Sequence, residues 1–284
     1  MNDFSEKTDD TFGTDLACER RRADISAPGV SYKRERSGIF TWERIDITSR
    51  EGEEAIGRPM GSYDTLSTER MDTLDASDIE DASNEIAAEL CRLFEKTSVV
   101  PSRILVVGLG NQYLTPDSIG PLSVSMVNAT LHLRKYDTEL FESFECSEIA
   151  VLTPGVMAKT GMESTDIVCA VCDAIEPDVV IAIDSIASRS PTRLGTTIQI
   201  SNTGIFPGSG IGKRRKALSE RNLGIPVIAI GVPTVINATA LCETCREDTR
   251  QNDEMFVSPR DIDALVSASS KIISQGINQA FGIF

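Results

Sequence analysis

The amino-acid sequence predicts an α/β fold, a doubly wound and mostly parallel sheet with helices on both faces. Three short runs rich in valine and isoleucine, residues 103–110, 178–186 and 225–233, have the length and composition of strands buried on both faces. Two segments with helical periodicity, residues 116–133 and 162–177, lie between the first two runs. Strand, helix and strand in succession is typical of parallel sheets that are covered by helices.

The N-terminal third of the chain is its more polar part. The spacing of apolar residues from Ile79 to Phe94 predicts one helix there, and the sequence contains no repeat or low-complexity tract. A chain of 284 residues, of which 40% are hydrophobic, is long enough to bury a full core. We expect a single domain over residues 16–284, divided into a polar N-terminal part at 16–100 and the α/β core at 101–284.

Composition excludes several classes of protein. The net charge of −15 argues against a general nucleic-acid binder. No apolar run approaches the ~20 residues that a membrane span needs, and the start MNDFSEKTDD is acidic and polar where a signal peptide would be basic and then apolar. We therefore expect a cytoplasmic protein. Seven cysteines, an odd number in a chain of this length, favour reduced thiols over a disulfide framework.

Two of the predicted strands lead into an aspartate. Asp117 follows the strand that ends near Gly108, and Asp184 closes the run VVIAID. Because ligands of doubly wound sheets bind beyond the carboxyl ends of the strands, both carboxylates are expected at one edge of the sheet. A single aspartate at such a place is often solvated or caps a helix. Two close carboxylates, however, can share a proton, one acting as a base toward water and the other as an acid.

The glycines of ILVVGLGNQYLTPDSIGP raise the question of a phosphate site. A dinucleotide-binding turn needs G-x-G-x-x-G, but Tyr113 stands at the third glycine position, and the lysine and hydroxyl residue of a P-loop are also missing. Residues 207–216, PGSGIGKRRK, are a better anion-binding candidate, although Arg214 replaces the P-loop hydroxyl. Three interpretations stay open for this segment: a mobile loop with a solvated basic face, contact with substrate, and nucleotide binding.

Other catalytic and metal-binding patterns are weak. His132 is the only histidine and lies in a helical stretch. The sequence has no G-x-S-x-G motif that would supply a catalytic serine, which favours His132 as a packed or surface residue of the helix. The two C-x-x-C pairs, Cys169/Cys172 and Cys242/Cys245, would together suit zinc. The first pair lies in an apolar helical run where such neighbours are ordinarily core residues, so no metal or cofactor is predicted.

Several long strings identify a family resemblance. LTPGVMAKTGMEST, IAIDSIASRSPTRLGTTIQISNTGIFPGSGIGKRRK, LGIPVIAIGVPTV and MFVSPRDID resemble the germination proteases of spore-forming bacteria, endopeptidases that degrade small acid-soluble spore proteins. The resemblance runs from about Thr14 to Ala280. It implies an atypical aspartic-type endopeptidase without a cofactor, with an α/β fold related to the hydrogenase maturation endopeptidases. It also implies a homotetramer in the cytoplasm of the developing spore.

The resemblance implies roles for the two aspartates. Asp117 in TPDSIGP and Asp184 in AIDSIAS match the pair held responsible for catalysis in the family. The related maturation enzymes hold nickel with two acids and a histidine, whereas the only histidine here lies in the helix after Asp117, so no metal is expected. Gly108 and Gly110 then serve to turn the chain sharply off its strand, and Pro116 helps to restrict the approach to Asp117.

The resemblance also covers the N-terminus and the basic segment. GTDLACE resembles the family's processing site, which implies a propeptide at residues 1–15 and a cut between Asp15 and Leu16; Gly13 stands where the family usually has arginine. A flexible tail is the alternative interpretation of residues 1–15. A local positive field would attract the acidic side of the scissile bond. We expect that field to come from four residues: Lys213, Arg214, Arg215 and Lys216.

Two other classes of function remain alternatives at this point. A nucleotide- or metal-dependent α/β enzyme would need the Gly108 turn or the Gly208 loop to hold a ligand, and a nucleotide would then raise the melting temperature. A non-catalytic module that binds spore proteins would bind such a substrate but release no fragments.

Overall fold

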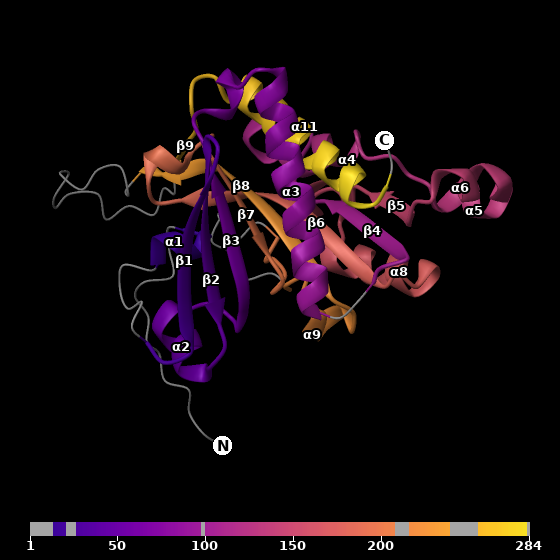
Figure 1. The fold of residues 1–284 in the computed structure, drawn as a ribbon, viewed down its shortest axis with the longest axis horizontal. Coiled ribbons are helices and arrows are strands. Elements are labelled where there is room, and N and C mark those ends of the chain that lie inside the picture. The colour runs from indigo at the N-terminus through magenta and orange to yellow at the C-terminus, as the bar shows by residue number, and fades with distance from the viewer. Residues whose placement is uncertain (1–13, 21–26, 98–99, 208–215, 239–254, 283–284) are drawn as a thin grey trace, which may run out of the picture.

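The protein forms a mixed sheet with helices on both sides (Figure 1). The structure is a computed structural model, and it describes residues 14–20, 27–97, 100–207, 216–238 and 255–282. Within these residues the sheet has nine strands in the order β1-β2-β3-β7-β8-β6-β4-β5, and the short β9 pairs with β8. The predicted α/β class is therefore confirmed.

Parallel strands form one half of the sheet. They are β4 (Arg103–Gly108), β5 (Glu148–Leu152), β6 (Val179–Ser188) and β8 (Val227–Asn237). β4 pairs in parallel with both β5 and β6, and β6 pairs in parallel with β8. The three apolar runs of the sequence are β4, β6 and β8, which are almost wholly buried, as expected for strands covered on both faces.

Antiparallel strands form the other half, which the sequence analysis did not predict. They are β1 (Val30–Ser37), β2 (Phe40–Ile47), β3 (Gly61–Ser67), β7 (Thr197–Ser201) and β9 (Phe256–Val257). β7 joins the halves, because it pairs antiparallel with both β3 and β8. The polar N-terminal part is thus mainly a sheet extension, whose outermost strand β1 alternates half-buried and exposed residues.

Long helices cover the sheet on opposite faces. α3 (Ala76–Thr97) and α11 (Ile262–Ala280) lie side by side on one face (Figure 1), where Ile86 and Ile273 share a core with Ile104 of β4. α8 (Ser164–Ile175) covers the other face through Val168. Neighbouring residues of β4 belong to the two different cores because side chains alternate along a strand. None of the described helices is both long and apolar enough to cross a membrane.

The helix expected over residues 116–133 is interrupted. It consists of the 3-10 turn η2 (Thr115–Asp117), α4 (Ile119–Val124) and the start of α5 (Leu131–Tyr136). Between the helices, Thr130 Oγ1 accepts a hydrogen bond from the Ile149 amide at 2.8 Å and donates one to the Ser147 carbonyl at 2.7 Å. These bonds tie the segment to β5 rather than continuing the helix. The remaining short elements are α1 (Ala17–Arg20), α2 (Arg50–Ile56), η1 (Met71–Thr73), α6 (Thr138–Phe144), α7 (Met157–Thr160), η3 (Pro191–Arg193) and α9 (Glu220–Leu223).

Two glycines let α4 approach the end of β4 closely. A Cβ on Gly120 would lie 2.3 Å from the Leu109 carbonyl oxygen and 2.5 Å from that of Ile183 in β6. A Cβ on Gly108 would lie 2.4 Å from the Gly120 carbonyl oxygen. Real Cβ atoms do not approach backbone this closely, so only glycine permits this contact between helix and strands.

Gly120→Ala is expected to lower the free energy of unfolding by about 3 kcal/mol, because the added methyl group forces the backbone of β4 and α4 apart. Gly38→Ala is the control, since Gly38 has a φ of 58° but open space around its Cβ position, and only the backbone conformation should cost about 1 kcal/mol. Urea unfolding of both variants measures the difference. Equal losses would contradict the close contact at Gly120.

A buried group of charges joins α3 to β2 and β3. Asp64 and Glu89 are only 1% and 2% exposed. Arg92 Nη2 lies 2.5 Å from carboxylate oxygens of both, and Arg44 Nη1 lies 3.5 Å from Asp64 and forms a shorter ion pair with Glu89. Burial, followed by the neighbouring negative charge of Glu89, raises the pKa of Asp64 to about 7.

This raised pKa predicts a loss of stability as the pH rises. The folded protein binds the Asp64 proton more tightly than the unfolded chain, so the stabilisation is complete below about pH 4 and is lost as the pH rises through about 7. Asp64→Asn removes this titration. Between pH 5 and pH 8, urea unfolding should show a loss at least about 1 kcal/mol smaller in the variant than in the wild type. The same loss in both proteins would rule out Asp64 as the source.

Candidate active site

Asp117 lies in a loop that closes on itself beyond β4. Gly110, at a φ of 107°, turns the chain, and a Cβ there would lie 2.1 Å from the Asp117 carbonyl oxygen. The Asn111 amide donates to Asp117 twice, to the carbonyl oxygen and to carboxylate Oδ2, both at 2.9 Å. Thr234 Oγ1 of β8 donates to the Pro116 carbonyl at 2.6 Å. The half-buried Asp117 carboxylate is therefore held by the Asn111 amide of its own loop, and β8 holds the neighbouring residue Pro116.

Asp184 lies in the buried middle of the sheet. It is 3% exposed, and its Oδ1 accepts a hydrogen bond from the Ser185 amide at 2.9 Å. β6 runs past the end of β4, because Gly108, the last residue of β4, is the Cα partner of Ile183. Asp184 is thus the first residue of β6 beyond that end, and its Cα partner in β8 is Gly231.

Backbone contacts bring the two aspartate segments to one place. The Leu109 amide donates to the Ile183 carbonyl at 2.8 Å, which places the start of the Asp117 loop beside Asp184. Gly120, three residues after Asp117, contacts the same Ile183 carbonyl. Both aspartates therefore lie at the carboxyl end of β4, although Asp184 lies inside β6, which continues to Ser188, rather than at the end of its strand.

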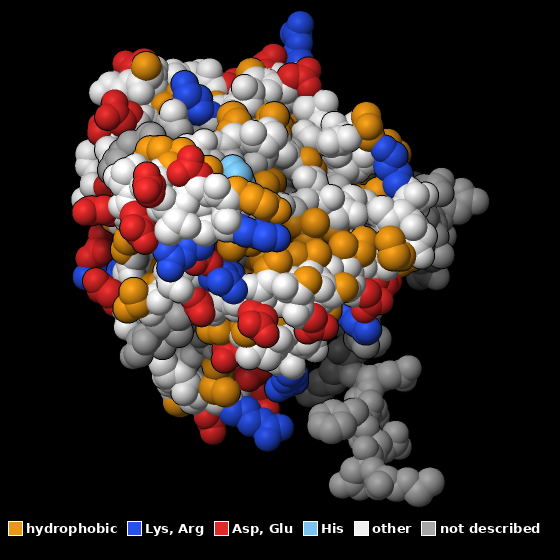
Figure 2. Space-filling view, turned by 90° about the vertical axis from the view of Figure 1, so that its right-hand side faces the viewer, with side chains coloured by type: hydrophobic (Ala, Val, Ile, Leu, Met, Phe, Trp, Pro, Cys, Tyr) orange, Lys and Arg blue, Asp and Glu red, His pale blue; other side chains and the backbone are white. Residues whose placement is uncertain are grey.

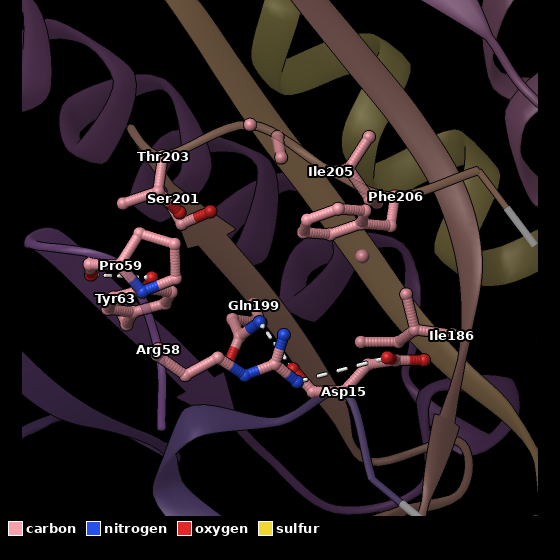
Figure 3. A pocket seen from close by; sticks show the side chains of 13 residues that line it. Asp15, Arg58, Pro59, Tyr63, Ile186, Gln199, Ser201, Thr203, Ile205 and Phe206 are labelled. Atoms are coloured by element: carbon pink, nitrogen blue, oxygen red, sulfur yellow. Dashed lines mark hydrogen bonds and ion pairs between the residues drawn. The ribbon is translucent and has the colours of Figure 1, made fainter. Parts of the chain in front are cut away.

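The N-terminal segment crosses β6 close to Asp184. The Asp15 amide donates to the Ala187 carbonyl at 2.9 Å, and the Ala187 amide donates to Asp15 Oδ2 at 2.9 Å. Arg58 Nη2 lies 3.8 Å from Asp15 Oδ1 and donates to the Thr14 carbonyl at 3.0 Å. These contacts hold an acidic side chain against β6 with a guanidinium opposite its carboxylate (Figure 3).

A pocket surrounds Asp15 on the face of the sheet that carries Asp184. Ile186 lines it two residues after Asp184, and Gly231, the strand partner of Asp184, also lines it. Alternate residues of a strand share a face, so Ile186 and Asp184 point to the same side of β6. Arg58 and Gln199 reach Asp15 from the antiparallel half, and Gln199 Nε2 donates to the Asp15 carbonyl at 3.3 Å (Figure 3).

The residues after Asp15 are packed like core residues. Leu16 and Ala17 are fully buried, and they share a cluster with Ile45, Ile47 and Ile186. Gln199 Oε1 accepts a hydrogen bond from the Ala17 amide at 2.8 Å. The bond between Asp15 and Leu16 is therefore held on both sides, by an ion pair on its acidic side and by apolar packing on the other.

Cys18 lies beside this site, and Cys172 lies in the core under α8. Burial raises the pKa of Cys18 and of Cys172 to about 11 in each case, so both thiols stay protonated at neutral pH and are poor nucleophiles. Cys172 lies on α8 with Cys169, three residues earlier, as the helical pattern suggested. Cys242 and Cys245 lie outside the described residues. Among the residues that the structure describes, no three His, Cys, Asp or Glu side chains gather in a way that could hold a metal ion.

The predicted basic segment is described only at its end. Lys213, Arg214 and Arg215 lie outside the described residues, and Lys216 Nζ lies 3.0 Å from Asp166 Oδ1 in an exposed ion pair. The binding role of these four residues stays a prediction. His132 is exposed on α5, in keeping with a surface helix residue.

Sequence reasoning missed the residues that contact Asp15. Arg58 follows α2 and Gln199 lies in β7, and neither belongs to a recognisable motif. Both come from the antiparallel half of the sheet, whose strands were not predicted. Neither side chain could be placed near Asp15 until the arrangement of these antiparallel strands was known.

Comparison with known proteins assigns the family. The family model described as Germination protease matches residues 13–247, most of the chain. This chain belongs to the germination protease family. It is 35% identical to a germination protease of Caldanaerobacter subterraneus subsp. tengcongensis, over 94% of this chain and 93% of that protein. The germination protease of Clostridium acetobutylicum is 33% identical over 94% of each chain, and that of Oceanobacillus iheyensis is 42% identical over 77% of this chain and 59% of that protein.

Germination proteases are peptidases, so the family also gives the class of reaction. Among solved structures, a NiFe hydrogenase maturation protease from Thermococcus kodakarensis KOD1 aligns with 65% of this chain and 98% of its own. The identity is 16% and the TM-score is 0.36, too low to add to the assignment.

Arg58→Gln should loosen the N-terminal segment, because it leaves the Asp15 carboxylate without its guanidinium neighbour. We expect the amides of Asp15 and Ala187 to exchange with solvent at least about tenfold faster, equivalent to a loss of about 1.4 kcal/mol in local stability. Arg50→Gln is the control, since its ion pair with Glu54 is exposed and should contribute little. Exchange that is unchanged by Arg58→Gln would contradict this role.

Proposed function

We propose that this germination protease is an aspartic-type endopeptidase, made as a zymogen that removes residues 1–15 by its own activity. Asp117 and Asp184 would activate water in the hydrolysis of small acid-soluble spore proteins. The observation that carries the proposal is the position of the Asp15–Leu16 bond. This bond lies on the Asp184 face of β6. Asp15, on its acidic side, bonds to Ala187, and Leu16, on its apolar side, packs in the buried cluster with Ile186.

The two carboxylates fit general acid and base roles. With one proton shared by the pair, the ionised carboxylate takes a proton from water as the water oxygen attacks the peptide carbon. The protonated carboxyl donates its proton as the C–N bond breaks and the amine leaves. The Asn111 amide donates to Asp117 and the Ser185 amide donates to Asp184, and these hydrogen bonds orient the two carboxylates.

The docked segment supports the class of substrate. Thr14 to Ala17 offer an acid, a large apolar residue and alanine in sequence, and Arg58, the apolar cluster and Gln199 contact them in that order. A spore protein with this order of residues would make the same contacts once the segment has left. Arg58 then supplies positive charge at the scissile bond, and the segment Lys213–Lys216 remains a proposed second source.

Assembly into a homotetramer in the spore cytoplasm is part of the proposal. Figure 2 shows hydrophobic side chains gathered in a band across one face of the protein. Exposed apolar residues at the β5 end of the sheet include Leu140 and Phe144 of α6 and Val151 of β5. Apolar patches of this kind are typical of protein interfaces, which supports contact with further copies of the chain.

Asp117→Asn and Asp184→Asn should each reduce the cleavage of a small acid-soluble spore protein at least about 10³-fold, because each keeps its shape but loses its charge. Asp81→Asn, on the exposed surface of α3, is the control and should keep wild-type turnover. Product masses and melting temperatures measure activity and folding. Binding of the spore protein without any fragments from the wild type would instead support a non-catalytic module.

The purified chain should cut itself between Asp15 and Leu16, and faster at mildly acidic pH than at neutral pH. Acid adds the proton that the aspartate pair needs when both members are ionised. Intact-mass measurement should find a chain that begins at Leu16, and the Asp184→Asn variant should stay uncut under the same conditions. A cut elsewhere, or the same cut in the variant, would disprove self-processing.

A further inference from the structure

Thr234 of β8 holds the turn that carries Asp117. Its side chain is fully buried, and its Oγ1 donates to the Pro116 carbonyl at 2.6 Å, across 118 residues of sequence. The turn itself, η2, contacts α11, β6 and β8. The hydroxyl of Thr234 therefore links the turn to the sheet on which the turn lies.

The hydrogen bond acts on the peptide group that leads into Asp117. The Pro116 carbonyl and the Asp117 amide belong to one planar and rigid group. The Asp117 amide donates to the Leu114 carbonyl at 2.8 Å, which fixes one end of this group within the loop. Thr234 fixes the other end from the sheet. Because both ends are held, the direction in which the chain enters Asp117 is set relative to β8.

β8 is irregular at the residue that makes this contact. Pro233 pairs with Ile186 of β6, and Val235 pairs with the next residue, Ala187. Thr234 lies between them as an extra residue, which makes this part of β8 a β-bulge. A bulge changes the direction of the side chain that it carries, and bulges are frequent next to active sites. The irregularity therefore lies at the residue whose hydroxyl reaches η2.

The bulge is also level with the docked N-terminal segment. Ala187, beside the bulge, is the residue of β6 whose backbone binds Asp15. Asp184 precedes it by three residues on the same strand. The contact at Thr234 thus relates the Asp117 turn to the part of β6 that carries the second aspartate and the Asp15–Leu16 bond.

We propose that Thr234 is a positioning residue for Asp117, and that the bulge in β8 serves to aim its hydroxyl at the turn. Thr234 acts through the Pro116 peptide group and not on the substrate. It keeps the Asp117 carboxylate where it can share a proton with Asp184. The inference rests on the proposed function, in which both carboxylates must be in place at once, and a small misplacement of a catalytic group is costly in rate.

Steady-state cleavage of a small acid-soluble spore protein tests this role. Thr234→Val keeps the shape of the side chain but removes the donor, and it should lower kcat at least about tenfold. KM should change less than about twofold, because Arg58 and the apolar cluster around Leu16 are unchanged. Thr234→Ser keeps the hydroxyl and should restore kcat to within about threefold of the wild type.

Thr130→Val is the matched control for folding. Thr130 is also a buried threonine, but its hydroxyl joins the Ile149 amide and the Ser147 carbonyl beside β5. Thr130→Val should lower the melting temperature at least as much as Thr234→Val, and it should leave kcat within about twofold of the wild type. A similar loss of kcat in both valine variants would assign the loss to stability and overturn the positioning role.

Hydrogen exchange tests the geometry of the turn without catalysis. The amides of Asn111 and Asp117, both bonded within the loop, should exchange at least about tenfold faster in Thr234→Val than in the wild type. Their exchange should be unchanged in Thr130→Val. Unchanged exchange in Thr234→Val, or an unchanged kcat, would overturn the inference.

The Asp117→Asn variant separates this inference from the proposed function. If Asp117→Asn is inactive while Thr234→Val cleaves at the wild-type rate, only the positioning role is overturned. If Asp117→Asn itself cleaves at the wild-type rate, the aspartate pair is wrong, and the role of Thr234 that depends on it is overturned as well.

Discussion

The contact between Gly108 and Gly120 is the constraint on which the site depends. Because neither residue has a Cβ, the start of α4 lies directly on the last residue of β4 and on the Ile183 carbonyl. The loop between the two glycines carries Asp117, and the residue after Ile183 is Asp184. A side chain at either glycine would push the start of α4, and with it the loop that carries Asp117, away from β4 and from the Ile183 carbonyl beside Asp184.

β6 carries the remaining contacts of the candidate site along one strand. Asp184 comes first along this strand. Ala187, whose amide donates to Asp15, follows it, and then the turn after Ser188, where the Arg189 amide donates to Glu19. The parallel half of the sheet thus supplies the proposed chemistry, and the antiparallel half supplies Arg58 and Gln199 to position the peptide. The join between β7 and β8 brings these contributions together.

Part of this arrangement could be predicted from the sequence. Buried parallel strands are continuous apolar runs, so β4, β6 and β8 were recognisable, and parallel order alone placed Asp117 and Asp184 at one edge. The antiparallel strands mix polar and apolar residues and gave no comparable signal. Arg58 therefore could not be assigned, because its role comes from contacts between segments far apart in the chain rather than from a local pattern. The break between α4 and α5 was missed for the same reason, since a bond from Thr130 to β5 decides it.

The docking of the N-terminal segment has a consequence for the order of folding. Asp15 is separated by 172 residues from its partner Ala187, and Ala17 by 182 residues from Gln199. During synthesis the segment emerges early, but its partners emerge only after most of the chain has been made. A truncated or half-folded chain therefore cannot form the contacts that hold the Asp15–Leu16 bond. If the chain cuts itself as proposed, the cut requires contacts with both β6 and β7. A chain that begins at Leu16 is then one in which both strands had already formed in the sheet.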